Sequence, residues 1–316
     1  MDVTERQRRL LGLCAIRVDG VSVDWSLIAR QGQFEEGLDA LWAGRVLETS
    51  AAARRSLPVL RRGIGDPDAL GGRVAAEIAA AERAGAELVT VLDEGYPANL
   101  RLISNRPPFL FYRGTLAGVD ARSVAVVGTR DASEAGLGRA AEVAGRLAEQ
   151  HVTVVSGLAR GIDTAAHRAA LERGGRTIAV LGTGITGCYP PENRELAGQI
   201  TGAGALVSQF WPTQGPHRDS FPRRNVVTSG LSQGTVVIEA SHTSGAKMQA
   251  RLALEHGKRV FLLEALVDGQ DWARKYVGRP GAITIGGADE VLPHLASPEQ
   301  IQRQARQNQQ LSLTLL

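Results

Sequence analysis

The sequence predicts an α/β protein with a doubly wound, mainly parallel sheet, a small helical domain before it and a flexible tail after it. From residue 123 onward, short β-branched and apolar runs alternate with amphipathic helical segments, a pattern typical of parallel sheets with helices on both faces. Before about residue 75, apolar residues recur every three or four positions, as on one face of a helix. The predicted units are the helical domain over 1–80, the sheet domain over 81–296 and a flexible Gln-rich tail over 297–316.

Each predicted strand is a short run rich in Val, Ile and Leu, bounded by glycine, proline or polar residues. A helix over 73–84 precedes the first strand, the stretch 95–114 is interpreted as a connection, and a helix over 288–295 closes the domain. The expected strands cover 87–92, 123–127, 152–155, 177–181, 205–209, 235–240, 259–264 and 282–285.

The N-terminal domain is predicted to contain helices and no strands, with helices over 5–18, 25–31 and 35–47. It ends near Gly63-Ile64-Gly65, for which two interpretations stay open. The glycines could form a simple turn that ends a helix. They also resemble the hairpin of helix-hairpin-helix modules, where backbone N–H groups meet a DNA phosphate. The domain over 1–80 as a whole resembles sterile-alpha-motif or helix-hairpin-helix domains.

The composition excludes several classes of protein. Of 316 residues 43% are hydrophobic, and no apolar run approaches the roughly 20 residues of a membrane helix. The first residues are charged and lack a secretory signal pattern, and Cys14 and Cys188 are too few for a disulfide framework or a thiolate zinc site. We therefore expect a cytoplasmic protein. The formal net charge of +3 does not by itself indicate a nucleic-acid partner.

Polar and glycine-rich segments follow the predicted strands at their carboxyl ends, where open parallel sheets bind ligands. Small residues let a backbone approach a ligand, and hydroxyl groups and helix N-termini favour phosphate. Arg130 and Arg224 add planar cationic groups to this edge, and Lys247 adds a third positive charge. The predicted phosphate-binding residues are Gly128, Thr129, Arg130, Ser156, Gly157, Arg160, Arg223, Arg224, Asn225, Ser244, Gly245 and Lys247.

A glycine pattern after the strand at 177–181 imitates a dinucleotide-binding fingerprint. Gly182-x-Gly184-x-x-Gly187 has the right spacing, but Pro190 and Pro191 oppose the helix that should contain the third glycine. We therefore expect neither NAD nor another cofactor.

Catalytic patterns are scarce. The six histidines show no spacing typical of metal ligands, so no metal site and no catalytic residue is predicted. Asp163 and His167, four residues apart on a helix, are expected to form a structural hydrogen bond.

Several segments resemble the DNA-processing protein A family, also called DprA or Smf. They are 124–130, 154–163 with Ala166-His167, 177–182 continuing to Tyr189-Pro190, 221–225, 230–232, 237–240 and 244–245. The resemblance covers about residues 87 to 290 in the correct order. It implies a Rossmann-like domain that binds single-stranded DNA, forms a homodimer and loads the RecA recombinase onto DNA in natural transformation (competence), without catalysis.

The resemblance also assigns roles and shows departures. The family's phosphate-binding arginine falls on Arg130, and its Arg-Asn pair falls on Arg224 and Asn225. Gln209 stands where the family commonly has Glu, and Lys247 and Gln249 stand where it has Leu and Thr. These changes make the site less negative or more positive, which favours an anionic partner.

Two alternatives stay open beside a binder of single-stranded DNA. The first is a phosphoribohydrolase, because Gly234-Thr235 followed by Glu239 resembles the Gly-Thr-x-x-Glu pattern of the cytokinin-activating enzymes (LOG proteins), although the glutamate comes too late in the sequence. The second is a nucleotide-binding sensor.

The aromatics Phe210, Trp211 and Phe221 could stack on bases or pack inside the protein.

The C-terminus carries a further pattern, Gln310-Leu311-Ser312-Leu313-Thr314-Leu315-Leu316. It resembles peptides that dock on the bacterial DNA polymerase sliding clamp, through Gln310, Leu311, Leu313 and Leu315. Such a peptide needs a glutamine amide, closely spaced apolar side chains and a chain free to extend. The alternative is that this segment packs against its own domain or a dimer partner.

Overall fold

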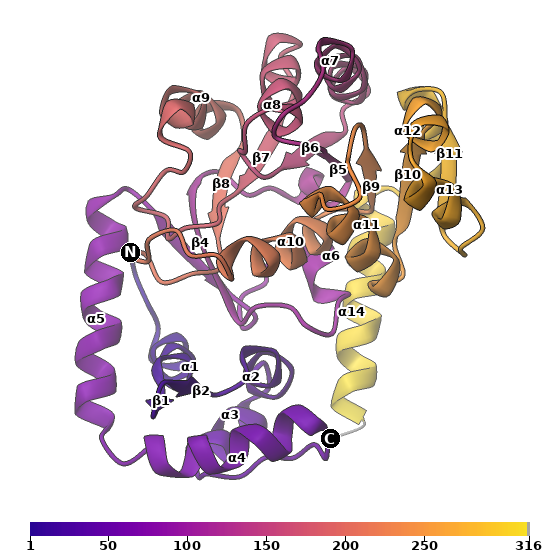
Figure 1. Cartoon of the computed structure of the whole chain (residues 1–316). Coiled ribbons are helices and arrows are strands. Elements are labelled where there is room, and N and C mark those ends of the chain that lie inside the picture. Colours follow the sequence, from indigo (N-terminus) through magenta and orange to yellow (C-terminus); the bar gives the residue numbers. More distant parts are fainter. Residues whose placement is uncertain (315–316) are drawn as a thin grey trace.

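The computed structural model describes the backbone of residues 1–314 and the side chains of residues 1–311. Within this range a nine-stranded sheet has the strand order β11-β10-β9-β5-β6-β7-β8-β4-β3 (Figure 1). Seven strands are parallel, whereas β4 pairs antiparallel with both β8 and β3. The strands are β3 (Glu87–Thr90), β4 (Phe109–Gly114), β5 (Ser123–Val127), β6 (Thr153–Ser156), β7 (Thr177–Val180), β8 (Ala205–Ser208), β9 (Gly234–Val237), β10 (Arg259–Leu263) and β11 (Ala282–Ile285).

Helices cover both faces of the sheet, which confirms the predicted doubly wound α/β fold. The chain runs from β5 through β8 in one direction and then crosses back to β9, so α7, α8 and α9 lie on one face and α10 and α11 on the other (Figure 1). The helices of this part are α7 (Glu134–Glu149), α8 (Ile162–Glu172), α9 (Arg194–Ala203), α10 (Ser220–Leu231), α11 (Gly245–Glu255), α12 (Glu264–Gly269) and α13 (Asp271–Val277).

Two predictions of local structure in this domain are wrong. The stretch expected to be a connection contains the short helix α6 (Ala98–Arg101) and β4, whose Phe109, Leu110 and Phe111 are fully buried. Burial on both faces gives such a strand a continuous apolar run instead of an alternating pattern. The helix expected over 288–295 is instead two short 3-10 turns, Ala288–Glu290 and Leu292–His294, because Pro293 lacks the N–H that a continuous helix requires.

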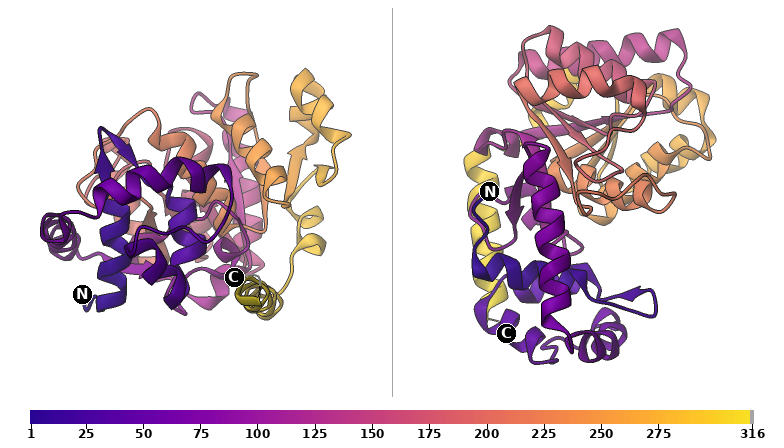
Figure 2. Two further views of the ribbon diagram at one scale, coloured as in Figure 1. Left: turned by 90° about the horizontal axis from the view of Figure 1, so that it is seen from below. Right: turned by 90° about the vertical axis from the view of Figure 1, so that its left-hand side faces the viewer.

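The N-terminal helices form a lobe beside the sheet domain (Figure 2). They are α1 (Glu5–Ala15), α2 (Trp25–Gly32), α3 (Glu35–Trp42), α4 (Ala51–Gly63) and α5 (Pro67–Arg83).

The lobe differs from the predicted one in a small hairpin, β1 (Arg17–Val18) and β2 (Val21–Ser22), where no strand was expected. α4 ends at Gly63 and α5 begins at Pro67, so Gly63-Ile64-Gly65 lies at a turn between two helices.

One apolar core joins this lobe to the sheet. Buried residues of α1, such as Leu10 and Leu13, belong to the same cluster as Phe111 and Val207 of the sheet. At the junction, the rings of Trp25 and Phe109 lie 5.0 Å apart. The apolar contact fixes the lobe against the sheet domain, while the domain boundary near residue 80 stays a prediction.

The C-terminal segment is helical, contrary to the prediction of a flexible tail. α14 (Pro298–Thr314) runs from the sheet domain toward the N-terminal lobe (Figures 1 and 2). Ser297 caps it, since Ser297 Oγ accepts from the backbone N of Gln300 and Gln300 Oε1 accepts from the backbone N of Ser297. Ile301 and Ala305, one turn apart, are buried. This short apolar stripe is masked in the sequence by the many glutamines around it.

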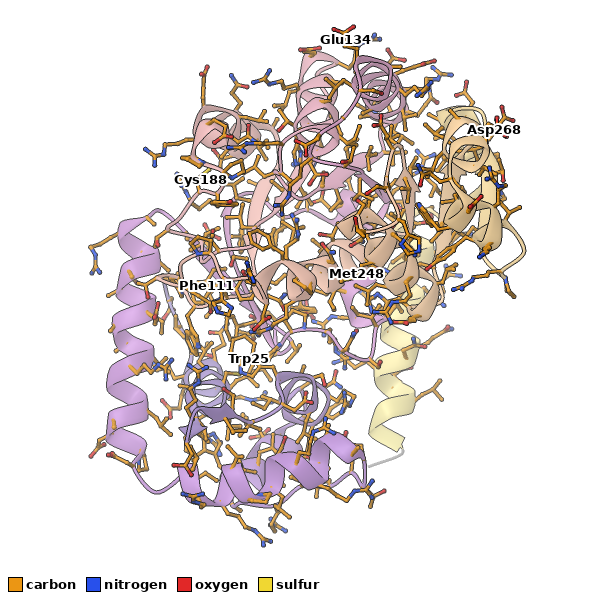
Figure 3. The ribbon with its side chains drawn as sticks, in the orientation of Figure 1. Trp25, Phe111, Glu134, Cys188, Met248 and Asp268 are labelled. Carbon is orange, nitrogen blue, oxygen red and sulfur yellow. The ribbon has the colours of Figure 1, made fainter. Side chains whose placement is uncertain are left out.

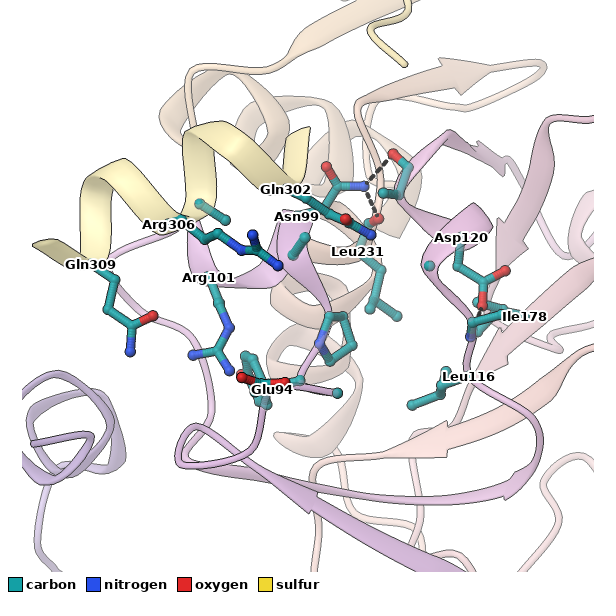
Figure 4. Close-up of a pocket in the computed structure, with 18 of the residues that line it drawn as sticks. Glu94, Asn99, Arg101, Leu116, Asp120, Ile178, Leu231, Gln302, Arg306 and Gln309 are labelled. Carbon is teal, nitrogen blue, oxygen red and sulfur yellow. Dashed lines mark hydrogen bonds between the residues drawn. The ribbon is translucent and has the colours of Figure 1, made fainter. Parts of the chain in front are cut away.

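α14 also closes one side of a hollow of about 720 Å³ against the loop before α6. Figure 4 shows Gln302 and Arg306 of the helix on one side of the hollow and Arg101 and Glu94 on the other. Asn99 at its base donates from Nδ2 to the carbonyl oxygens of Ala121 and Leu231, at 2.9 and 2.8 Å, and ties α6 to the end of α10.

The proposed clamp-binding peptide falls at the end of this helix. Gln310 and Leu311 lie in α14, and Leu311 is exposed. Leu313 lies in the last helical turn, while Leu315 and Leu316 are outside the described residues. Clamp docking stays a prediction, and in an extended form it requires the last turns of α14 to unwind.

Among the helices of residues 1–314, none combines the length and apolarity needed to cross a membrane.

The buried His167 leads to a prediction about pH. It is 0% exposed, and burial lowers its pKa to about 3. In the unfolded chain the pKa is about 6.5, so below that pH the unfolded chain binds a proton that the folded protein does not. The burial of neutral His167 therefore does not reduce the unfolding free energy above about pH 6.5. Below that pH the unfolding free energy falls by about 1.4 kcal/mol per pH unit as the pH drops toward 3.

Urea unfolding at pH 7, 6 and 5 measures this dependence, because most carboxylates remain ionised over that interval. A His167→Gln variant is expected to show a shallower dependence than the wild type. Equal unfolding free energies of the wild type at all three pH values contradict the prediction.

Candidate nucleic-acid interface

The carboxyl ends of β5, β6 and β9 meet at a pocket of about 400 Å³, bounded by the first turns of α10 and α11. We call it the rim pocket. It lies where the topology of a doubly wound sheet places ligands. Eight of the predicted residues line it: Gly128, Thr129, Arg130, Gly157, Arg224, Asn225, Ser244 and Gly245.

The other four predicted residues lie outside the rim pocket. Ser156 is buried and donates to the carbonyl oxygen of Val126 at 2.7 Å. Arg160 is exposed and paired with Glu192. Lys247 lies beside the ring of Trp272, with Nζ 6.0 Å from its centroid. Arg223 faces the N-terminal lobe, as described below.

Arg224 is the central residue of the rim pocket. It is only 8% exposed, its Nη1 donates to the carbonyl oxygen of Val180 at 2.9 Å, and its Nε donates to Asn225 Oδ1 at 3.2 Å. Burial lowers the pKa of its guanidinium. These contacts tie α10 to the end of β7 and fix the guanidinium beside the pocket.

A buried carboxylate faces this arginine. Asp163, in the first turn of α8, accepts hydrogen bonds from the backbone N of Gly157 at 3.1 Å and of Ala159 at 3.3 Å. Burial raises the pKa of Asp163, and Arg224 and these N–H donors partly counteract the shift.

The expected hydrogen bond between Asp163 and His167 is not formed. His167 Nδ1 instead lies 2.7 Å from Thr177 Oγ1 on β7. The carboxylate turns toward the loop after β6, because the backbone N–H groups of Gly157 and Ala159 donate to it there and the charge of Arg224 attracts it.

The pocket glycines have a different role from the one expected. An ideal Cβ on Gly157 would lie 1.6 Å from Arg224 Nη1, and one on Gly128 would lie 2.3 Å from Ile162. These two glycines make room for protein atoms and not for a ligand. Gly245 is different, since nothing lies within 4 Å of its Cβ position, and its backbone remains open to the pocket.

The aromatic residues divide into two groups. Phe210 and Trp211 are buried, as the packing interpretation predicts. Phe221 lines the rim pocket, and its ring lies 5.2 Å below the guanidinium of Arg130 and 5.7 Å from the ring of Tyr189. Tyr189 is 43% exposed, so it offers a second ring for stacking that the sequence analysis missed.

The charges at the rim pocket favour an anion modestly. Arg224 is balanced by Asp163, whereas Arg130 is exposed and pairs with no carboxylate within 4 Å among the described residues. Asp131 also lines the pocket. The N-termini of α10 and α11 add partial positive charge. Anion binding would therefore depend more on hydrogen-bond donors held in fixed positions than on a strong positive electrostatic field at the rim pocket.

The glycine pattern after β7 does not lead into a helix. Gly182 to Gly187 is followed by the 3-10 turn Pro191–Asn193, and α9 begins only at Arg194. The prediction that the prolines prevent a dinucleotide-type helix here is confirmed. Across residues 1–311, no cluster of three His, Cys, Asp or Glu side chains could hold a metal ion.

Comparison with known proteins gives one family. The family model for DNA recombination-mediator protein A matches residues 87–295. The DNA processing protein DprA of Streptococcus pneumoniae is 38% identical over 204 residues, which are 64% of this chain and 72% of that protein. The Smf protein of Escherichia coli is 39% identical over 214 residues, which are 66% of this chain but only 56% of that protein.

Solved structures agree with the fold. The X-ray structure of DprA from S. pneumoniae superimposes with a TM-score of 0.74 at 29% identity, covering 94% of this chain and 99% of that one. DprA from Helicobacter pylori, described for its mode of binding single-stranded DNA, gives a TM-score of 0.59 at 24% identity over 66% of this chain and 94% of that one.

Replacing Gly157 tests how the site is built. Gly157→Ala should displace the buried guanidinium of Arg224 and lower the unfolding free energy by about 1–3 kcal/mol, the cost of an unsatisfied buried polar group. Gly138→Ala is the matched control, because the Cβ of residue 138 in α7 meets nothing within 4 Å. Alanine at 138 should stabilise the helix by about 0.5–1 kcal/mol. Urea unfolding measures both, and a Gly157→Ala variant as stable as the wild type contradicts this account.

Proposed function

Because the chain belongs to the DNA recombination-mediator protein A family, we propose that it binds single-stranded DNA without catalysis and acts as a recombination mediator in the cytoplasm. The observation that carries the proposal is the rim pocket, which combines a fixed buried arginine with an exposed arginine lying over an aromatic ring. All of it falls within the part of the chain that the family model matches.

The rim pocket offers the two kinds of contact that single strands need. Arg130 and the open backbone at Ser244 and Gly245 bind phosphate groups of the strand. Phe221 and Tyr189 stack on bases, which every base allows. Binding is therefore expected to tolerate any sequence and to prefer a single strand, whose bases are free to stack.

The resemblance to the family adds two partners to the proposal. We propose that the chain forms a homodimer and that it helps RecA replace single-strand-binding protein on DNA. The support for both is family membership alone.

A phosphoribohydrolase is less well supported. Glu239, the candidate acid of that pattern, accepts from Ser133 Oγ at 2.7 Å and from the Ser133 backbone N at 3.2 Å. The carboxylate thus holds the start of α7, next to Gly136. A group engaged in this way is poorly placed to act on a substrate.

Equilibrium binding to labelled single-stranded and duplex oligonucleotides over a salt series tests the main proposal. We expect preference for the single strand and a log-log salt slope of about −0.7 for each phosphate contact. Arg130→Ala should weaken binding and flatten the slope by about one contact. Arg168→Ala, at an exposed position on α8, is the control for loss of one positive charge.

Two results would contradict the proposal. Equal effects of Arg130→Ala and Arg168→Ala would mean that the rim pocket is not the binding site. Release of free base from nucleoside monophosphates, with no affinity for single strands, would favour the hydrolase instead.

The partner proposals have their own measurement. Light scattering of the full chain at micromolar concentration should give the mass of a dimer. In a RecA strand-exchange reaction blocked by single-strand-binding protein, the chain should restore exchange, and the Arg130→Ala variant should restore less. A monomer, or no stimulation of exchange, removes the corresponding partner from the proposal.

A further inference from the structure

Two consecutive arginines at the start of α10 face different cavities. Arg224 lines the rim pocket, whereas Arg223 lines a cleft of about 590 Å³ between the N-terminal lobe and the sheet domain. Consecutive helical side chains point about 100° apart, so the first turn of α10 lies between the two sites. We call the second site the lobe cleft. Trp25, which lines it, is labelled in Figure 3 at the junction of the lobe and the sheet domain.

The lining of the lobe cleft carries more positive than negative charge, with four arginines against two carboxylates. Four arginines line it, and none has an ion pair within 4 Å among residues 1–311: Arg17, Arg73, Arg106 and Arg223. Its two carboxylates accept hydrogen bonds from neighbouring backbone and hydroxyl groups and form no ion pair with these arginines. Asp24 caps α2, and Glu77 accepts from the backbone N and Oγ of Thr213 at 3.0 and 2.7 Å. Such a site favours an anion.

Two buried donors in the lobe cleft have no acceptor. Gln209 is 6% exposed, and its Nε2 has no hydrogen-bond partner among the described residues. Arg106 is 8% exposed, and its Nε also has none. Buried polar groups are nearly always satisfied, so a site with two unsatisfied donors points to a ligand that supplies acceptors.

Two of the four arginines of the lobe cleft lie over aromatic rings. The guanidinium of Arg223 lies 5.2 Å from the ring centroids of both Trp25 and Phe210, and that of Arg73 lies 6.0 Å from the ring of Trp211. The rings hold the planar guanidinium groups in place, and guanidinium planes and aromatic rings both stack on nucleobases. Positive charge, free donors and stacking planes together match a phosphate–base unit.

We propose that the lobe cleft is a second binding site for the same single strand of DNA, which continues from the rim pocket across the first turn of α10. This inference rests on the proposed function. The rim pocket holds one part of the strand at Arg130 and Phe221, and the lobe cleft holds the next part at Arg223 and Trp25. A strand too short to span both sites is held at the rim pocket alone, and the lobe cleft adds binding only for longer strands.

Binding of oligothymidines of two lengths, about six and about twenty nucleotides, to the full chain tests this inference. Arg223→Gln should weaken binding of the long strand roughly tenfold and leave the short strand nearly unchanged. Its salt slope with the long strand should flatten by about 0.7. Arg168→Ala is the control for loss of charge, and Arg130→Ala should weaken both lengths.

A second variant avoids removing a packed side chain. Gln209→Glu keeps the size of the residue but places a carboxylate among the arginines of the lobe cleft. It should therefore also weaken binding of the long strand and spare the short one. Urea unfolding of each variant shows whether its fold is intact, and Gln209→Glu retains the test where Arg223→Gln is unstable.

The outcomes separate this inference from the proposed function. If Arg130→Ala weakens both lengths while Arg223→Gln and Gln209→Glu weaken neither, the rim pocket stands and the second site is overturned. If the wild type binds no single strand, both proposals fail. If thymidine monophosphate binds as tightly as the long strand and Arg223→Gln abolishes that binding, the lobe cleft is a nucleotide site and the continuous strand is overturned.

Discussion

The buried guanidinium of Arg224, packed against Gly157, organises this end of the molecule. It connects α10 to the ends of β6 and β7 through the carbonyl oxygen of Val180 and the space left by the missing Cβ of Gly157. A lysine could not replace it, because a single ammonium group cannot present a planar set of donors to several acceptors. With Arg224 fixed, the register of α10 is fixed too. The neighbouring Arg223 is then directed toward the N-terminal lobe.

Charge balance explains why the two sides of α10 differ. Removing a guanidinium from water is costly unless a partner accompanies it, and Asp163 provides that partner beneath the rim pocket. Asp163 therefore neutralises most of the charge of Arg224 inside the protein, and Arg130 supplies the exposed positive charge. In the lobe cleft, Arg223 and Arg73 lie against Trp25, Phe210 and Trp211 and form no ion pair within 4 Å among residues 1–311, so they remain available to an anion.

The sequence predicts the sheet well because most of its strands are short β-branched runs between breakers. β4 was missed because Pro107 and Pro108 precede it and because β4, buried on both faces, lacks alternation. α14 was missed because two buried residues, Ile301 and Ala305, give too weak a periodic signal among glutamines. In the site, the rule that ligands lie at the carboxyl ends of strands placed eight of the twelve predicted residues in the rim pocket. It could not separate Arg223 from Arg224, because the start of α10 sets their directions. Tyr189 entered the sequence analysis only as part of a segment that resembles the family, and not as a ring for stacking.

Photo-cross-linking tests the path of the strand most directly. A single strand carrying a photoreactive thymine analogue, irradiated with the full chain, can be mapped to peptides by mass spectrometry. The account predicts cross-links to the peptides that contain Tyr189 and Phe221 with short and long strands, and to the peptide that contains Trp25 with long strands only. Cross-links confined to α7 and α8, on the opposite face of the sheet, would contradict it.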